Sequence, residues 1–493
     1  MSIDSQSPVL VWFRDDHRLS DNPALSAAVA SGSRVLCFYV LDEASEGIRP
    51  LGGAARWWLH GSLRALGEAL ERAGSRLVLF RGPALQAVET VVRGTGASAI
   101  YWNRRYGAAE IAVDSALKKS LTERGIKAHS FNGRLLNEPW EVANQAGKPF
   151  QVFTPYLRAV TARPISTPIP SPERIPGGTW GESILARATS LDALGLEPSS
   201  PDWASGIRAA WQCGEQAAQD RLKEFIGAGL KGYAEQRDRP FMDGTSRLSP
   251  HLRFGEISPR QVWHAVMGAV AREPGLESDA RKYLSEVVWR DFSYQLLDVH
   301  PHLPDRSHSP RFEHFPWAGN PETLKAWQRG LTGYPIVDAG MRQLWQTAWM
   351  HNRVRMIVAS FLVKHLLTDW RQGESWFWDT LVDADPANNA FGWQWVAGSG
   401  PDSAPFHRIF NPVTQGEKFD PDGRYVRTYV PELASLPAAF IHKPWEAPPG
   451  LLHEKGIRLG ETYPAPIVPH GPARARALEA FQSLRDLEAE ALS

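Results

Sequence analysis

Short apolar runs alternate with amphipathic segments across residues 8–131, and this alternation restricts the fold more than any other feature of the chain. The runs VLVWF, VLCFYVL, RLVLF, AIYW and KAHSF have the length and the β-branched and aromatic content of buried strands. Segments 56–73 and 108–124 lie between such runs and have the apolar spacing of helices. Strands that alternate with helices favour a doubly wound parallel sheet, so we predict an α/β domain here.

The first predicted strand is not followed by a GxGxxG motif, which argues against an ordinary dinucleotide site at that point. The polar stretch WFRDDHRLSDNPAL follows it instead, at the end of the strand where open sheets usually bind ligands. A capped loop that enters a helix explains the same residues. The two interpretations are compatible.

The regular alternation ends after residue 131, and this divides the chain into parts. Residues 163–200 are rich in Pro, Ser and Gly, which is typical of an ordered but irregular connection. From residue 206 onward helical patterns dominate. We therefore predict an α/β domain over 1–135, a connector over 136–205, and a mainly α-helical domain over 206–493.

The stretch from Trp349 to Trp395 contains an unusual set of polar and aromatic side chains. Its first half, WMHNRVRMIVASFLVKHLLTDW, has apolar residues at three- and four-residue steps and predicts one long helix. On this helix Asn352 and Met356 would face the same way, with Arg353 beside them. Paired acids, paired amides and clustered tryptophans follow in LVDADPANNAFGWQW. Such a set suits a large planar cofactor whose polar edge is hydrogen-bonded.

Two further stretches carry polar groups in a helical context. In YLSEVVWRDF, a helix would place Glu286, Trp289 and Arg290 on one face, although an ion pair in a core explains the same spacing. The GTSRLS run offers hydroxyl and backbone N–H groups that could hold a diphosphate, and a helix-capping turn explains it equally well. Neither stretch is decisive alone.

Composition limits the class of protein. Lys+Arg and Asp+Glu both number 54, so a nucleic-acid surface would have to be a local basic patch. The two cysteines lie far apart, which makes a structural disulfide improbable and indicates a reducing compartment. No apolar run approaches the roughly 20 residues needed to cross a bilayer. We predict a soluble, cytoplasmic, monomeric protein without a metal site.

Several of these stretches, in this order, resemble the motifs of the photolyase/cryptochrome family, and of class I photolyases within it. The matching stretches are WFRDDHRLSDNPAL, GTSRLSPHLRFGEIS, SEVVWRDF, TGYPIVDAGMRQL, MHNRVRM, ANNAFGWQW and NPVTQGEKFD. The resemblance covers almost the whole chain. It implies an N-terminal α/β domain for an antenna pigment, joined by a long loop to a helical domain that binds FAD.

The resemblance also implies roles for individual residues. FAD-binding roles fall on Tyr233, Thr245, Ser246, Leu248, Ser249, Arg290, Arg355, Asp383, Asp385 and Asn389. Roles in binding DNA and its lesion fall on Arg237, Glu286, Trp289, Asn352, Arg353 and Trp395. Catalytic roles fall on Glu286, Asn352 and Met356, and Trp393, Trp370 and Trp317 match the tryptophans that relay electrons to the flavin. Arg355 and Asp383 match an ion pair over the isoalloxazine, and Asn389 matches the position facing flavin N5.

The activity that the resemblance implies is light-driven splitting of cyclobutane pyrimidine dimers in DNA, with an electron supplied by reduced FAD. Asn352 and Met356 stand where six-four photolyases have two histidines, and Asn352 and Asn389 stand where plant cryptochromes tend to have acids. The main alternative is a cryptochrome-like blue-light sensor with the same fold. A nucleotide-binding domain like that of electron-transfer flavoproteins is a third possibility, which the tryptophan-rich stretch does not suit.

The antenna pigment is left open by the sequence. Glu110 matches a carboxylate that contacts folate in some relatives, whereas Ala109 and Arg49 depart from the folate-binding pattern. Methenyltetrahydrofolate, a deazaflavin and the absence of an antenna all remain compatible with these residues.

Overall fold

The computed structural model of the chain describes residues 7–492, with side chains described as far as residue 484. Contacts divide these residues into two compact units. The first unit comprises the described residues up to Lys231, with Ser246–Pro301 and Val382–Ala384; the second comprises Gly232–Thr245, His302–Leu381 and the residues from Asp385 on. The predicted boundaries after residues 135 and 205 do not coincide with this division and remain a prediction.

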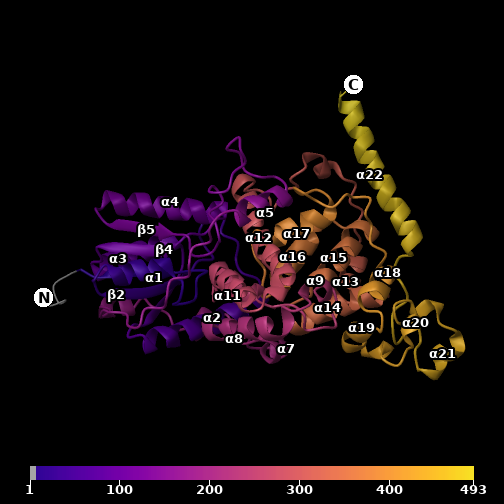
Figure 1. The fold of residues 1–493 in the computed structure, drawn as a ribbon. Coiled ribbons are helices and arrows are strands. Elements are labelled where there is room, and N and C mark those ends of the chain that lie inside the picture. The colour runs from indigo at the N-terminus through magenta and orange to yellow at the C-terminus, as the bar shows by residue number, and fades with distance from the viewer. Residues whose placement is uncertain (1–6, 493) are drawn as a thin grey trace. The chain divides into compact units, whose positions relative to one another are not determined.

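A five-stranded parallel sheet forms the N-terminal part of the first unit (Figure 1). Its strands are β1 (Val9–Phe13), β2 (Val35–Leu41), β3 (Leu77–Arg81), β4 (Ala99–Asn103) and β5 (Lys127–Phe131). They are arranged in the order β3-β2-β1-β4-β5, so that Val9 pairs with Val35 on one side and with Ala99 on the other. Each predicted apolar run forms a strand, and the predicted α/β class is confirmed.

Helices α1 (Pro23–Ala30) and α2 (Gly53–Arg72) cover one face of this sheet, and α3 (Ala84–Thr95) and α4 (Ala108–Glu123) cover the other. The other α-helices of the first unit are α5 (Phe153–Thr161), α6 (Glu182–Leu185), α7 (Ser205–Ala210), α8 (Glu215–Glu224), α10 (Ser249–Arg253), α11 (Pro259–Arg272) and α12 (Glu277–Val299). Val11 and Cys37 pack with α1 and α2, whereas Trp12 and Phe38 pack with α3 and α4. Alternate residues of each strand therefore enter two separate apolar cores.

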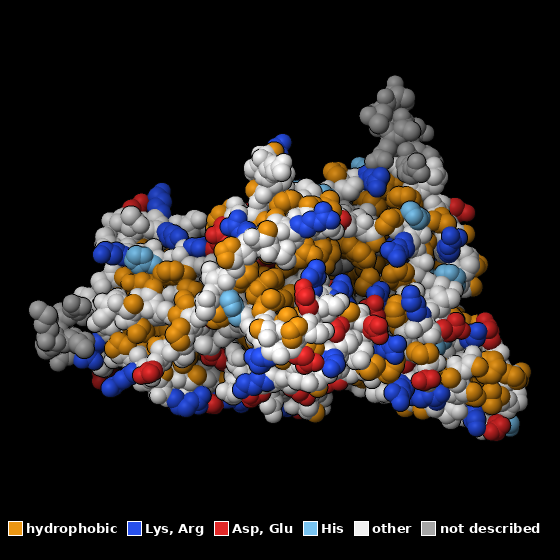
Figure 2. Space-filling view, in the orientation of Figure 1, with side chains coloured by type: hydrophobic (Ala, Val, Ile, Leu, Met, Phe, Trp, Pro, Cys, Tyr) orange, Lys and Arg blue, Asp and Glu red, His pale blue; other side chains and the backbone are white. Residues whose placement is uncertain are grey.

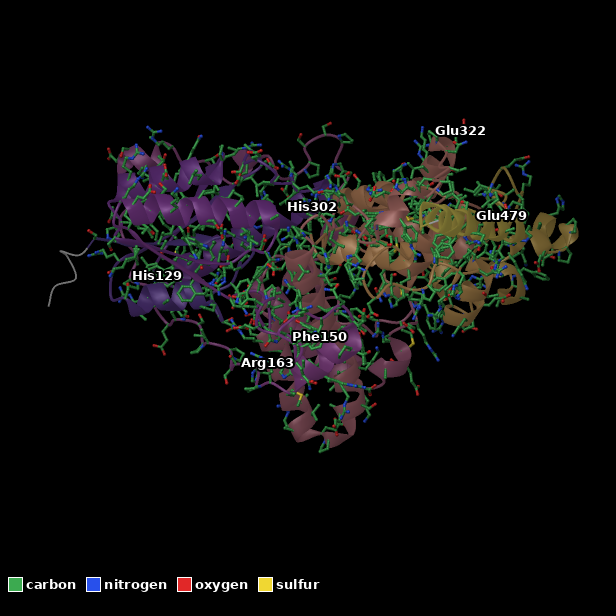
Figure 3. All side chains as sticks on the ribbon, turned by 90° about the horizontal axis from the view of Figure 1, so that it is seen from above. His129, Phe150, Arg163, His302, Glu322 and Glu479 are labelled. Carbon is green, nitrogen blue, oxygen red and sulfur yellow. The ribbon has the colours of Figure 1, made fainter. Side chains whose placement is uncertain are left out.

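The predicted connector contains more regular structure than its composition indicates. Helix α5 lies within it, between Phe150 and Arg163, which Figure 3 labels, and α5 packs against α12. Short turns of helix at α6 and at Asp192–Leu194 follow. Tertiary packing against α12 supplies the stability that a nine-residue helix lacks on its own.

Asp291 of α12 anchors the beginning of this connector. Its two carboxylate oxygens accept hydrogen bonds from the backbone N–H groups of Leu136, at 3.2 Å, and Asn137, at 3.0 Å. Burial raises the pKa of Asp291 to about 7, because desolvation outweighs these two hydrogen bonds and the nearby charge of Arg290. Between pH 3.8 and about pH 7, the folded protein therefore holds a proton on Asp291 that the unfolded chain releases.

This carboxyl predicts a pH-dependent stability. The folded-state pKa of Asp291 lies above the ordinary value of 3.8. The contribution of this carboxyl to the free energy of unfolding is therefore fully present below pH 3.8 and is lost as the pH rises through about 7. We expect the free energy of unfolding of the unaltered protein to fall more steeply than that of Asp291→Asn between about pH 5 and about pH 8. Urea unfolding across this range would measure the two slopes, and equal slopes would contradict the assignment.

The second unit is helical, as predicted. Its α-helices are α9 (Tyr233–Gln236), α13 (Pro321–Arg329), α14 (Pro335–Thr347), α15 (Asn352–Ser360), α16 (Trp370–Thr380), α17 (Asn388–Ala397), α18 (Pro412–Phe419), α19 (Arg424–Tyr429), α20 (Ala438–Ile441), α21 (Pro449–Glu454) and α22 (His470–Leu492). Within residues 7–492, β5 is the last β-strand.

The single long helix predicted from Trp349 onward is wrong. Helix α15 ends at Ser360 and passes into a π-helical turn over Phe361–His365. Leu367 then adopts a positive φ of 51°, and Asp369 caps the start of α16 by accepting a hydrogen bond from the N–H of Arg371. A left-handed residue cannot continue a right-handed helix, so the apolar periodicity spans two helices.

The surface carries charges of both signs, as the equal numbers of basic and acidic residues in the sequence predict. Figure 2 shows Lys and Arg side chains intermingled with Asp and Glu over one face of the molecule. Within residues 7–492, no helix combines the length and the apolar character that a bilayer crossing requires.

Candidate active site

One face of α12 remains accessible in a stretch of helix that is otherwise buried. Within residues 283–297 every side chain is buried except those of Glu286 and Trp289, which are half-buried. These two residues are three positions apart and therefore lie on the same face of the helix. Arg290 is buried, and its guanidinium donates to the backbone carbonyls of Arg134, at 2.6 Å, and Leu252, at 3.3 Å.

Two neighbours of this accessible face were not singled out from the sequence. The ammonium of Lys282 lies 3.3 Å from a carboxylate oxygen of Glu286. The ring of Phe153 stacks on Trp289, with ring centroids 3.6 Å apart and planes 9° from parallel. The four-residue spacing of Lys282 and Glu286 was a usable sequence signal. Phe153 lies in α5, and no local pattern connects it with Trp289.

The hydroxyl-rich turn of the first unit begins at Ser246 and leads into α10 at Ser249. Arg247 has a positive φ of 51°, which few side chains adopt without strain. The carbonyl of Ser246 accepts a hydrogen bond from Arg221 at 3.0 Å, and Leu248 is buried. These contacts hold the turn in one conformation. Asp383, also in the first unit, is buried.

In the second unit, the start of α15 is held by His351. The N–H of Arg353 donates to Nδ1 of His351 at 3.2 Å, so the imidazole caps the helix. Burial lowers the pKa of His351 to about 4, which keeps it neutral and able to accept. Asn352 is exposed at this end of the helix, and Met356 is half-buried one turn later.

Arg353 belongs to a charged cluster that the sequence did not reveal in full. Its guanidinium lies 2.8 Å from a carboxylate oxygen of Asp238, 3.7 Å from the sulfur of Met356 and 4.6 Å from the ring centre of Phe419. Arg237 lies 3.8 Å from the same Asp238 carboxyl group. Asp238 therefore holds both predicted DNA-binding arginines, and its only sequence signal was its place beside Arg237.

The amides and acids after α16 orient one another. Asp385 accepts from the backbone N–H of Ala387 and from both the backbone and side-chain N–H groups of Asn388, at 2.8–3.0 Å. The side-chain nitrogen of Asn389 donates to the carbonyl and carboxylate oxygens of Glu374, at 3.0 and 2.8 Å. The amide oxygen of Asn389 is thereby directed away from Glu374. Glu374 was not recognised from the sequence.

The other predicted flavin residues of the second unit are Arg355, Tyr233 and Thr245. Arg355 donates to the backbone carbonyl of Met350 at 2.8 Å. Tyr233 is buried at the start of α9, with the guanidinium of Arg237 5.7 Å from its ring centre. Thr245 ends the segment that carries α9.

The three predicted relay tryptophans all lie in the second unit. Trp393 is buried against Phe377 and Trp327, with ring centroids at 5.0 and 6.2 Å. Trp370 is fully buried and donates to Ser307, and Trp317 contacts Phe315 at 4.4 Å. Trp395, two residues after Trp393, is half-buried.

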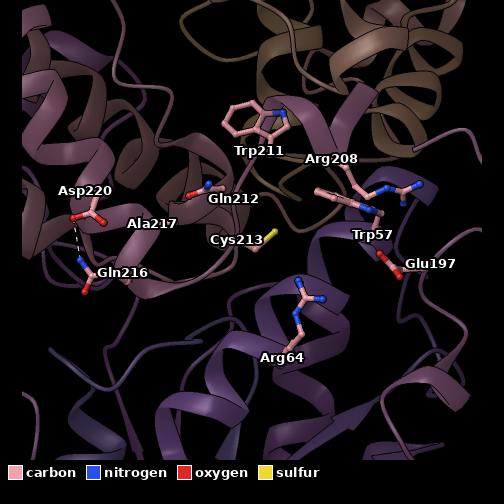
Figure 4. A pocket seen from close by; sticks show the side chains of 11 residues that line it. Trp57, Arg64, Glu197, Arg208, Trp211, Gln212, Cys213, Gln216, Ala217 and Asp220 are labelled. Atoms are coloured by element: carbon pink, nitrogen blue, oxygen red, sulfur yellow. Dashed lines mark hydrogen bonds between the residues drawn. The ribbon is translucent and has the colours of Figure 1, made fainter. Parts of the chain in front are cut away.

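A cavity of about 530 Å³ lies elsewhere in the first unit, between α2 and the α7–α8 region (Figure 4). The indoles of Trp57 and Trp211 line it, together with Arg64, Glu197 and Cys213. Behind them, Trp58 meets Trp211 edge-on at 5.4 Å. The volume is that of a small-molecule site, and the small exposed parts of the two indoles, 6% and 9% of Trp57 and Trp211, give it apolar surface. Glu110 is not among its lining residues.

Metal-binding chemistry finds no support in the described part of the chain. Among the side chains that the structure describes, residues 7–484, no three of His, Cys, Asp or Glu come together as a metal site would require.

Comparison with known proteins places these features in context. The sequence profile of DNA photolyase matches residues 9–173, and that of the FAD binding domain of DNA photolyase matches residues 283–483. A deoxyribodipyrimidine photo-lyase from Agrobacterium fabrum is 50% identical over 97% of this chain and 98% of its own. Cryptochrome-1 of Arabidopsis thaliana is 41% identical over 97% of this chain and 71% of its own.

Solved structures of photolyases are also similar to this chain over almost its whole length. A bacterial class III photolyase from Agrobacterium tumefaciens has a TM-score of 0.94 and 50% identity, over 99% of this chain and 100% of its own. An archaeal photolyase from Sulfolobus tokodaii, described with two FAD molecules that imply a novel light-harvesting cofactor, has a TM-score of 0.79 and 30% identity, over 97% of this chain and 100% of its own. The class I subdivision predicted from the motifs is not confirmed by these relatives.

The residues present fit a bound flavin. The Asn389 amide is held by Glu374 so that its oxygen can accept from an N–H group of a cofactor. In the same unit, Asp385 adds a buried carboxylate, which can accept hydrogen bonds from a polar ring edge. Tyr233 and Trp393 supply buried apolar surface there. This donor and acceptor set matches what a planar heterocycle with a polar edge requires.

Proposed function

Because the chain belongs to the photolyase/cryptochrome family, we propose that it is a DNA repair enzyme that splits cyclobutane pyrimidine dimers under blue light. The observation that carries the proposal is the 50% identity, over 97% of the chain, with a deoxyribodipyrimidine photo-lyase. The accessible face of α12 supports it, because Glu286 and Trp289 are half-buried on a helix that is otherwise buried. A partly exposed carboxylate beside a partly exposed indole suits a nucleobase.

Bound FAD in its reduced form would supply an electron to the dimer on absorbing light. That electron would allow two carbon–carbon bonds of the dimer to break and would be recovered afterwards, so the reaction would involve no net oxidation or reduction. Trp289 and Trp395 would stack on the damaged bases, with stacking worth about 1–3 kcal/mol per base. Extrusion of the poorly stacked dimer would cost a few kcal/mol.

Polar groups of the chain would orient the lesion and the strand. Glu286 and Asn352 would hydrogen-bond the base edges, and Met356 would pack beside them. Arg237 and Arg353 would contact phosphates and so position DNA without reading its sequence. Asn389, with Asp383, Asp385 and Arg355, would hold the flavin ring, and Tyr233, Thr245, Ser246, Leu248, Ser249 and Arg290 would hold the rest of the cofactor.

The direct test is repair by the purified protein. Dimer-containing oligonucleotides, single- and double-stranded, would be illuminated with reduced protein and assayed for the loss of thymine dimers. We expect repair only in the light. Dimers that persist under illumination, in a sample whose absorption spectrum proves that reduced FAD is bound, would contradict the proposal.

A second chromophore is proposed for the cavity lined by Trp57 and Trp211. A planar pigment such as methenyltetrahydrofolate or a deazaflavin would lie between flat indoles, and Arg64 would face its acidic groups. The light-harvesting cofactor of the Sulfolobus tokodaii photolyase supports a second pigment in this family. The two candidates differ in absorption, near-ultraviolet for the folate and blue for the deazaflavin.

Removing both indoles should release this pigment. We expect Trp57→Ala/Trp211→Ala protein to lose the second absorption band while retaining FAD, because two stacking contacts of about 0.5–1.5 kcal/mol each and their apolar area are lost. Trp140→Ala is a matched control, since this indole is 58% exposed and lies outside the cavity. An unchanged spectrum in the double variant would place the pigment elsewhere.

A blue-light sensor is the alternative function, favoured by the 41% identity with cryptochrome-1 of Arabidopsis thaliana. The repair assay separates the two, since a sensor would bind FAD and respond to light without removing dimers. We further propose that the protein acts as a monomer on damaged DNA in the cytoplasm. Light scattering with and without DNA would test the monomeric state.

A further inference from the structure

We propose that Lys282 is a positioning residue for dimer repair, because its ammonium holds the Glu286 carboxylate and compensates its charge beside the lesion. The inference rests on the function proposed above. The Nζ atom of Lys282 lies 3.3 Å from Oε1 of Glu286, one turn further along α12. The Lys282 side chain is 45% exposed and that of Glu286 is 28% exposed, so the pair lies at the edge of the accessible face.

Helix stability alone does not account for this pair. An exposed ion pair at this spacing stabilises a helix only slightly, and less with the lysine before the glutamate. Arg281 and Glu277 form such a pair at the start of the same helix, at 2.6 Å, with side chains 78% and 65% exposed. That pair is in water, whereas Glu286 lies in line with Trp289 on the accessible face.

The location of the pair matters because the proposed reaction moves negative charge. While the dimer carries the extra electron, an uncompensated carboxylate within hydrogen-bonding reach would repel it, and the indole of Trp289 would exclude the water that screens such repulsion. An ammonium 3.3 Å from the carboxylate oxygen offsets part of this field at the dimer. The same contact fixes the orientation of the carboxylate on the accessible face.

The test separates charge compensation from DNA binding. Lys282→Met removes the charge but retains a similar unbranched stem, Lys282→Arg keeps the charge, and Arg281→Met is the matched control. The repair quantum yield at saturating DNA and the Kd for dimer-containing duplex would be measured for each. We expect Lys282→Met to lower the quantum yield about two-fold or more with little change in Kd, Lys282→Arg to restore it, and Arg281→Met to leave both unchanged.

The same substitution made in a Glu286→Gln protein tests whether Lys282 acts through Glu286. In a Glu286→Gln protein there is no carboxylate to compensate, so adding Lys282→Met should not lower the quantum yield further. Three results would overturn the proposal. The repair quantum yield could be unchanged in Lys282→Met, or it could fall equally in the unaltered and the Glu286→Gln protein. The third such result is a change in the Kd for dimer-containing duplex with no change in the quantum yield. If the unaltered protein splits no dimers, the proposed function fails. If it repairs normally and Lys282→Met does too, only this inference fails.

Discussion

Replacing Gly373 by alanine should destabilise the second unit by about 1–3 kcal/mol, because it forces an extra carbon into a filled core. A Cβ atom at Gly373 would lie 2.1 and 2.4 Å from two ring carbons of Trp393 and 2.7 Å from a methyl carbon of Leu362. Trp393 is buried against Phe377 and Trp327 and has little room to move. Alanine favours a helix by about 1 kcal/mol over glycine, but the clash opposes that gain.

Gly392→Ala is the matched control for this substitution. Gly392 precedes Trp393 on α17, and a Cβ atom there would meet nothing within 4 Å. The control should therefore be neutral or stabilising, so the two variants are expected to shift the urea midpoint in opposite directions. A Gly373→Ala midpoint equal to or above that of Gly392→Ala would show that the packing around Trp393 is looser than the structure indicates.

Replacing Trp393 by phenylalanine should almost abolish light-driven reduction of oxidised FAD. The prediction follows from the proposed relay through Trp393, Trp370 and Trp317, since phenylalanine is much harder to oxidise than tryptophan. Absorbance under blue light, with an external thiol as electron donor, would follow the reduction. Repair by protein whose FAD is chemically reduced beforehand should continue, because the relay is needed only to prepare the cofactor.

Trp327→Phe provides the control for that experiment. Trp327 is fully buried in contact with Trp393 but lies outside the proposed relay, and the substitution removes a similar amount of core volume. We expect it to reduce stability with little effect on photoreduction. An equal loss of photoreduction in both variants would mean that the damage is structural or that electrons pass through Trp327 as well.

The roles of the site residues depended on motifs rather than on geometry. Glu286 and Trp289 could be placed on one helix face from their spacing, and α12 has them there, half-buried among buried neighbours. The same spacing could have added Lys282. Asp238, Glu374 and Phe153 could not have been found this way, because each contacts its partner across a distance in sequence that no local period encodes.

What the sequence determined by itself was the sheet, the helical character of the rest and the family, because strand and helix periods and contiguous motifs are local properties of the chain. Tertiary structure alone decided where the central helix breaks, since the left-handed Leu367 leaves the apolar period unaltered. It alone decided that Trp57 and Trp211, far apart in the chain, line one cavity. Both depend on packing between distant segments, which a single sequence does not specify locally.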